Sequence, residues 1–157
     1  MSKYEEGMKI LNERFGNNKD NVIALATISL EPGEGGRPRP CVRDVDAYYE
    51  DGAFYIVTYA QSNKMKQTGV NPEVSVSVNM EDFFSSGVAE NLGWVMEPRN
   101  AAIRDKLRTT FAAWYDFANN EADKDCVFLA IRMTKGTLRI NHGEMFYHFD
   151  FVNRTAT

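Results

Sequence analysis

The stretch from Thr58 to Lys64 holds the residues whose types and spacing best suit the binding of an anion. A predicted strand ends at Thr58, a short turn follows, and Ser62 opens a predicted helix with Lys64 in its first turn. Free N–H groups at a helix start favour a negative charge, and the helix dipole adds to this preference. The two hydroxyls and the ammonium group could together hold a phosphate monoester. Lys66 lies two positions beyond Lys64, so we expect it to face solvent.

A purely structural role for Ser62 is the alternative. Serine is a preferred N-cap residue, and its hydroxyl oxygen commonly accepts a hydrogen bond from a backbone amide in the first helical turn. In that case Ser62 would only start the helix, and the segment would need no ligand.

The other reactive side chains form less specific patterns. His142 and His148 lie near two carboxylates in the sequence, but their spacing matches no standard ligand motif, and we expect no metal site. The two cysteines, Cys41 and Cys126, are distant and form no Cys-x-x-Cys pair, which indicates neither a disulfide framework nor a zinc site. Cys41 could be a reactive thiol beside Arg43, but we expect a small buried apolar residue.

Hydrophobic periodicity predicts the first elements that must position these residues. Tyr4, Met8, Leu11 and Phe15 recur at helical spacing, so we expect an opening helix. The nearly unbroken apolar run at 22–30 is rich in β-branched residues, which predicts a strand buried on both faces.

Strands separated by short turns follow along most of the chain. A strand over about 39–49 leads through Asp51-Gly52 into a second strand at 53–58, because Asp-Gly supplies the positive φ angles of a hairpin turn. A helix of about two turns from Ser62 to Thr68 precedes Asn71-Pro72. The remaining expected elements are strands at 74–78, 87–96, 127–133, 137–140 and 144–151, and a helix from Pro98 with an apolar stripe of Ile103, Leu107, Phe111, Trp114 and Ala118.

The composition is that of one globular domain over residues 1–157. Hydrophobic residues make up 43% and charged residues 25% of the chain. Six to eight mostly antiparallel strands with few helices predict an α+β chain dominated by β structure, with a small barrel. Acidic residues outnumber basic ones by 22 to 18, which argues against a general nucleic-acid binder. No apolar run approaches about 18 residues and no signal core is found, so we expect a cytoplasmic protein without membrane contact.

The anion-binding stretch and three other segments together form a longer pattern. They are Pro40-Cys41-Val42-Arg43-Asp44-Val45-Asp46, Glu50-Asp51-Gly52-Ala53-Phe54-Tyr55, Thr58-x3-Ser62-x-Lys64 and Asn71-Pro72-Glu73-Val74. Together they resemble the pyridoxamine 5′-phosphate oxidase-like superfamily, whose members are FMN-binding split barrels. The resemblance covers residues 20–80 well and the later strand order loosely. It implies a split β-barrel with a few flanking helices.

The resemblance also implies roles for individual residues. Thr58, Ser62 and Lys64 match the positions that grip the flavin phosphate, which agrees with the anion site read from the residues alone. Arg43 matches the strand arginine that meets the cofactor, and the backbone around Val57 would line the same pocket.

The match departs from the oxidases at two places. Asn63 belongs to the cofactor-binding motif, but the oxidases proper often carry a second cation at this position. Their tryptophan-rich substrate region and Arg-x-His-x-Arg-type pair have no counterpart in residues 139–151, so we do not expect oxidation of pyridoxamine phosphate. The short chain is more similar to the general-stress-protein branch. A homodimer with two FMN sites at the subunit interface is also implied.

From this resemblance we expect an FMN-dependent oxidoreductase. Bound FMN would transfer electrons or hydride between a reduced donor and an unidentified small-molecule substrate, and no side chain is assigned as a catalytic acid or base. One alternative is a flavin-binding redox or stress protein without turnover. Another is the same barrel with haem, for which His142 or His148 would be the axial ligand, or with a deazaflavin.

Overall fold

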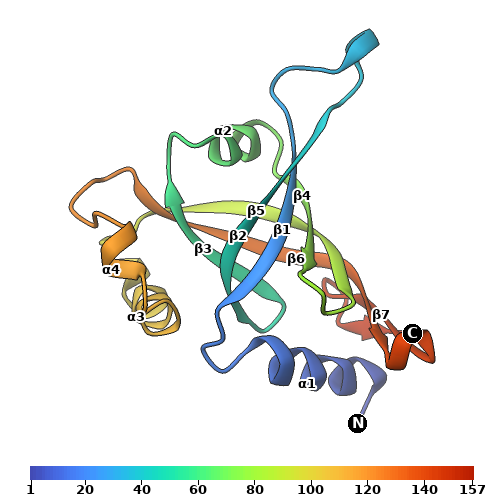
Figure 1. Cartoon of the computed structure of the whole chain (residues 1–157). Coiled ribbons are helices and arrows are strands. Elements are labelled where there is room, and N and C mark those ends of the chain that lie inside the picture. The colour runs from blue at the N-terminus through green and yellow to red at the C-terminus, as the bar shows by residue number, and fades with distance from the viewer.

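Six antiparallel strands close into a barrel in the order β3-β2-β1-β4-β5-β6, because β3 pairs back onto β6 (Figure 1). The computed structural model describes all 157 residues. The barrel strands are β1 (Asn21–Ile28), β2 (Pro40–Glu50), β3 (Ala53–Tyr59), β4 (Glu73–Val78), β5 (Phe83–Trp94) and β6 (Cys126–Ile140). Two further strands, β7 (Met145–Asp150) and β8 (Thr155–Ala156), extend the sheet beyond β6. The predicted β-dominated split barrel is confirmed.

The opening helix α1 (Lys3–Phe15) covers one end of the barrel. It begins with a capping box, in which the Ser2 hydroxyl accepts from the Glu5 backbone amide and the Glu5 carboxylate accepts from the Ser2 amide. The Phe15 ring is fully buried and packs edge-on against Tyr49, with centroids 5.9 Å apart. The predicted helix is therefore confirmed, and its apolar face packs into the barrel core.

Two strand predictions are wrong in detail. β1 is buried on one face only, and Val22 is 39% exposed, because the strand alternates between the barrel interior and its outside. The two strands expected at 127–133 and 137–140 are one continuous strand, β6, which pairs with β3, β5 and β7 along its length. Pairing partners far away in the sequence decided this continuity, and local periodicity does not reveal them.

The predicted helix with one apolar stripe is also interrupted. α3 (Ala101–Thr110) ends before Phe111, a turn follows, and α4 (Tyr115–Ala118) adds one short turn of helix. The Trp114 ring stacks on Phe111 with centroids 4.6 Å apart, and its Nε1 donates to Asp20 at 3.0 Å. These tertiary contacts override helix propensity, which is a weak determinant.

A second apolar cluster lies outside the barrel, between α3 and the neighbouring strands. Its buried members are Tyr48, Val95, Leu107, Phe111, Tyr115, Cys126 and Phe128. Arg104 of α3 donates twice to the Glu121 carboxylate, at 2.6 and 2.8 Å, which holds the following loop against the helix. No helix of the structure combines the length and the apolar character needed to cross a membrane.

Candidate anion-binding site

The end of β3 and the start of α2 (Asn63–Val70) form the strand–turn–helix unit that the sequence predicts. The Ser62 amide donates to the Tyr59 carbonyl at 3.0 Å, which closes the turn, and the Lys66 amide donates to the Ser62 carbonyl at 3.1 Å, which begins the helix. This unit lies at the opposite end of the barrel from α1 (Figure 1). Ser62 is therefore the N-cap residue, with an extended backbone.

The Ser62 hydroxyl does not perform the usual capping function. It makes no hydrogen bond to a backbone amide of α2, and its Oγ is buried without any hydrogen-bond partner in the chain. A buried hydroxyl without a partner is unfavourable by about 1–3 kcal/mol. The structure thus disagrees with a purely capping role for Ser62, in which its hydroxyl would accept a hydrogen bond from a backbone amide of α2.

Lys64 brings a half-buried positive charge to the same helix start. Its ammonium group forms no salt bridge, whereas other residues of the chain make nine ion pairs. These pairs are Lys9–Glu13, Lys19–Glu81, Arg104–Glu121, Lys106–Glu50, Arg108–Asp116, Arg108–Glu121, Arg132–Glu90, Lys135–Asp150 and Arg139–Asp82. Burial, and to a lesser extent the charge of Arg43, lowers the pKa of Lys64 from its ordinary value. Lys66 is exposed, as its spacing predicts.

Arg43 reaches from β2 toward α2 and is held by three hydrogen bonds. Its Nη1 donates to Thr27 Oγ1 at 2.7 Å and to the Leu25 carbonyl at 3.1 Å, and its Nη2 donates to Gln67 Oε1 at 2.8 Å. The same Gln67 oxygen accepts from the Thr27 hydroxyl at 2.6 Å. No carboxylate pairs with the guanidinium, and burial lowers the pKa of Arg43. Arg43 and Lys64 are therefore two cations without a carboxylate partner, and they lie close enough for the charge of Arg43 to lower the pKa of Lys64.

Sequence reasoning missed Thr27 and Gln67, which fix Arg43 in place. Gln67 lies three residues after Lys64, so helical spacing alone puts both side chains on one face of α2. Thr27 could not be found in this way, because its place opposite Cys41 depends on the β1–β2 register. The sequence offers no local signal for that register.

Cys41 lies at the edge of this network. It is partly exposed, which corrects the expectation of a buried residue, and its Sγ lies 3.7 Å from the Gln67 side-chain nitrogen. The strand is open to solvent on this side because it leaves the barrel here (Figure 1). Cys126 is buried, and burial raises its pKa to about 11.

The other predicted site residues are Thr58, Asn63 and Val57, and none of them makes a side-chain hydrogen bond to Arg43, Ser62 or Lys64. Thr58 is half-buried at the end of β3, where its backbone pairs with Val127. Asn63 is exposed in the first turn of α2. The Val57 side chain packs against the outer apolar cluster beneath α3, so only its backbone could face the site. The structure thus brings Arg43, Ser62 and Lys64 to one place and directs the Val57 side chain elsewhere.

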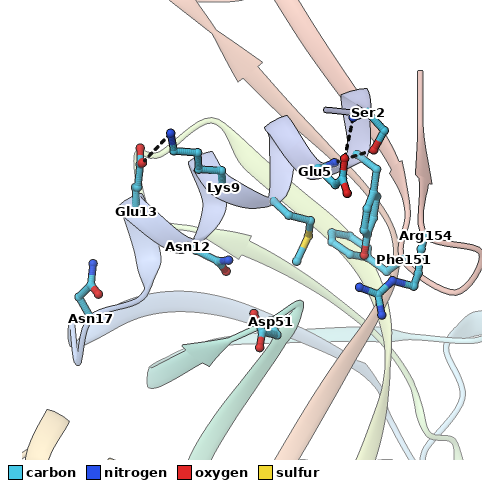
Figure 2. Close-up of a pocket in the computed structure, with 11 residues that line it drawn as sticks. Ser2, Glu5, Lys9, Asn12, Glu13, Asn17, Asp51, Phe151 and Arg154 are labelled. Carbon is cyan, nitrogen blue, oxygen red and sulfur yellow. Dashed lines mark hydrogen bonds and ion pairs between the residues drawn. The ribbon is translucent and has the colours of Figure 1, made fainter.

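A large hollow lies at the other end of the molecule. It is a groove of about 770 Å³ between α1, the β2–β3 turn at Asp51 and the C-terminal residues Phe151 and Arg154 (Figure 2). None of the larger hollows is lined by Ser62 and Lys64. A ligand held at α2 would therefore extend over a surface that this chain leaves open.

The histidines do not assemble a site. His142 lies in an exposed turn with a positive φ of 56°, and His148 lies exposed on β7, where its ring stacks on Phe146. The His148 Nδ1 lies 3.1 Å from the Thr137 hydroxyl. No three histidine, cysteine, aspartate or glutamate side chains are gathered where they could hold a metal ion.

Solved structures resemble the chain, whereas no protein-family model and no curated protein matches its sequence. The Campylobacter jejuni protein ChuZ aligns over 98% of this chain and 62% of its own, with 17% identity and a TM-score of 0.71. A haem binding protein from Mycobacterium smegmatis aligns over 98% and 60%, with 17% identity and a TM-score of 0.67. This chain thus spans less than two thirds of either protein.

A third similar structure has a length closer to that of this chain. It is a FAD-binding protein from Mesorhizobium loti, which aligns over 74% of this chain and 83% of its own, with 20% identity and a TM-score of 0.57. Structures named as a pyridoxamine 5′-phosphate oxidase, general stress protein 26 and a F420 reductase also match. At these identities the comparisons show the fold, and the fold agrees with the resemblance read from the sequence.

Proposed function

Because the chain has the split-barrel fold of the pyridoxamine 5′-phosphate oxidase-like proteins, we propose that it binds FMN through the cluster of Arg43, Ser62 and Lys64. The flavin would supply hydride or electron transfer between a reduced donor and a small-molecule substrate. The protein would act as an FMN-dependent oxidoreductase. Its own residues would bind and orient the cofactor.

The orphaned hydroxyl of Ser62 is the observation that carries this proposal. A phosphate monoester offers acceptor oxygens that would satisfy the hydroxyl, and its charge would compensate Lys64. The free amides at the start of α2 suit the same group. Arg43 would contribute a second positive charge from a position fixed by Thr27 and Gln67.

A homodimer with FMN at the subunit interface belongs to the same proposal. The anion cluster lies outside the larger hollows of the single chain, so a flavin ring attached to the phosphate would be exposed to water on one side. A second copy of the chain would cover that side and shape the entrance for the substrate.

The alternatives predict different ligands or a different behaviour. A flavin-binding redox or stress protein would retain FMN but would not be reduced by NADH or NADPH at a useful rate. Haem would need an axial ligand, and the two histidines of the chain are both exposed at the C-terminal edge of the sheet. A deazaflavin would use the same phosphate cluster, so competition with FMN would reveal it.

The visible spectrum after incubation with FMN and desalting tests the proposal. We expect the wild-type protein to retain the flavin bands and a Ser62→Ala/Lys64→Ala variant to lose them. Lys66→Ala is the matched control, since it removes an exposed lysine from the same helix. A wild-type protein that never retains FMN, or a double variant that retains it fully, would contradict the proposed site.

A further inference from the structure

The groove beside α1 is built from three separate segments, each of which is fixed by local interactions. α1 begins at its capping box, and the β2–β3 turn packs so closely that a Cβ at Gly52 would lie 3.3 Å from the Phe151 ring. The turn between β7 and β8 is closed by Asn153, whose backbone and side-chain nitrogens both donate to the Asp150 carboxylate at 2.9 Å. The walls of the groove are therefore preformed, as they are in most small-molecule sites.

Two charges of opposite sign line this groove without a partner. Asp51 and Arg154 belong to two different turns that face α1 (Figure 2). Neither takes part in any of the nine ion pairs of the chain, and neither side chain makes a hydrogen bond within it. Lys9 lines the same groove but is paired with Glu13 at 3.9 Å. Asp51 and Arg154 do not pair with each other either, so the space between them is left for another group.

The Tyr4 hydroxyl lies near both charges and is also without a partner. Only 9% of Tyr4 is exposed, and its ring packs edge-on against Phe151, yet its hydroxyl makes no hydrogen bond within the chain. Burial raises the pKa of Tyr4. The charge of Arg154 acts in the opposite direction, and the charges of Asp51 and Asp150 add to the increase, so the hydroxyl is within reach of both signs of charge. A nearly buried hydroxyl that lines a groove without a partner points to a polar ligand group.

This arrangement favours a ligand that carries both charges. A purely anionic ligand would pair with Arg154 but be repelled by Asp51, and a purely cationic ligand would pair with Asp51 but be repelled by Arg154. A zwitterion satisfies both side chains, and a guanidinium group can hold a carboxylate with two parallel hydrogen bonds. Met8 and Phe151 add apolar surface to the same groove, which suits an apolar side chain. The volume of about 770 Å³ lies within the range of small-molecule sites.

We propose that this groove binds an α-amino acid with an apolar side chain. The carboxylate of the ligand pairs with Arg154 and accepts a hydrogen bond from the Tyr4 hydroxyl, and its ammonium group pairs with Asp51. Its apolar side chain lies on Met8 and Phe151. The groove and the candidate anion-binding site are at opposite ends of the barrel, so the inference does not depend on the proposed function (Figure 1).

Titration of the isotope-labelled protein with L-phenylalanine, followed by nuclear magnetic resonance, tests the proposal. We expect saturable shifts of the amide signals of Asp51, Gly52 and Arg154. L-phenylalanine should bind at least about tenfold more tightly than phenethylamine, which lacks the carboxylate, or phenylpropionate, which lacks the ammonium group. No saturation at millimolar concentration, shifts confined to another region, or equally tight binding of either analogue would overturn the proposal.

Two variants that preserve the turns separate the two charges. Asn-Gly favours the same turn as Asp-Gly, and asparagine tolerates the positive φ of 56° found at Arg154, so Asp51→Asn and Arg154→Asn should both fold.

Each variant should weaken L-phenylalanine binding about tenfold, whereas Asp51→Asn should not weaken phenylpropionate binding and Arg154→Asn should not weaken phenethylamine binding. Lys9→Gln is the control, because Lys9 lines the groove but is paired with Glu13. An equal loss in the control, or a loss of both analogues in either variant, would contradict the assigned contacts.

Discussion

The guanidinium of Arg43 and the side-chain oxygen of Gln67 lie 2.8 Å apart, so the strand arginine is tied to the helix that carries Ser62 and Lys64. Gln67 is neutral, and the bond therefore fixes the arginine without cancelling its charge. A substitution of Gln67 can therefore change the net charge of the site while the orientation of Arg43 is kept.

Gln67→Glu should keep the hydrogen bond to Arg43 and cancel one of the two positive charges of the cluster. The carboxylate would accept from Arg43 as the amide oxygen does, so the free energy of unfolding should not fall. FMN binding should weaken about tenfold, because a bound phosphate would then meet one net charge less. Flavin fluorescence titration measures this effect, with the exposed Asn18→Asp as a control of equal charge. Unchanged affinity would mean that Arg43 does not act on the ligand.

Asp46 makes the stability of the fold depend on pH. Burial, together with the neighbouring Asp20, raises the pKa of Asp46 from 3.8 to about 6. The folded state thus holds a proton that the unfolded state releases earlier, so the free energy of unfolding falls as the pH rises from about 4 to about 6. Above this range the penalty is constant.

Asp46→Asn should remove this penalty. At about pH 8 the variant should be more stable than the wild type by about 1 kcal/mol, after allowance for solvent screening at a half-buried carboxylate, and at about pH 3.5 the two should be equal. Urea unfolding at both pH values measures the difference. Asp44→Asn, at an exposed position of the same strand, is the control. Equal stability at pH 8 would contradict the assigned origin of the pKa shift.

Substitution by alanine should have opposite effects on the stability of the fold at two glycines, Gly136 and Gly69. A Cβ at Gly136 would lie 2.9 Å from Ser85 Cβ and 3.0 Å from the Phe84 carbonyl, so Gly136→Ala should separate β6 from β5 and destabilise the fold by about 1–3 kcal/mol. A Cβ at Gly69 in α2 meets nothing, and Gly69→Ala should stabilise by about 0.5–1 kcal/mol. Thermal unfolding of both variants gives the two signs. A Gly136→Ala variant more stable than the wild type would mean that β5 and β6 can separate locally at no cost in the free energy of unfolding.

The elements of the barrel were predictable where local chemistry defines them. The Asp51-Gly52 turn has the positive φ angles, 44° and 83°, that Asp-Gly favours, and β4 alternates between buried and exposed residues as its sequence does. The continuity of β6 and the break after α3 were not predictable, because each depends on partners far away in the sequence. Ser62 and Lys64 were found from helix-start chemistry and Arg43 from the family resemblance, whereas Thr27 needed the register of β1 against β2.

The relative affinity for FMN and riboflavin shows whether the Ser62–Lys64 site binds a phosphate, because the two ligands differ only in the phosphate group. We expect the wild type to bind FMN at least about a hundredfold more tightly, as is typical of several charge-assisted hydrogen bonds to one phosphate. We also expect Ser62→Ala to weaken FMN binding and to leave riboflavin binding unchanged. Equal affinity for both ligands, or an equal loss of both in the variant, would contradict a phosphate site at Ser62 and Lys64.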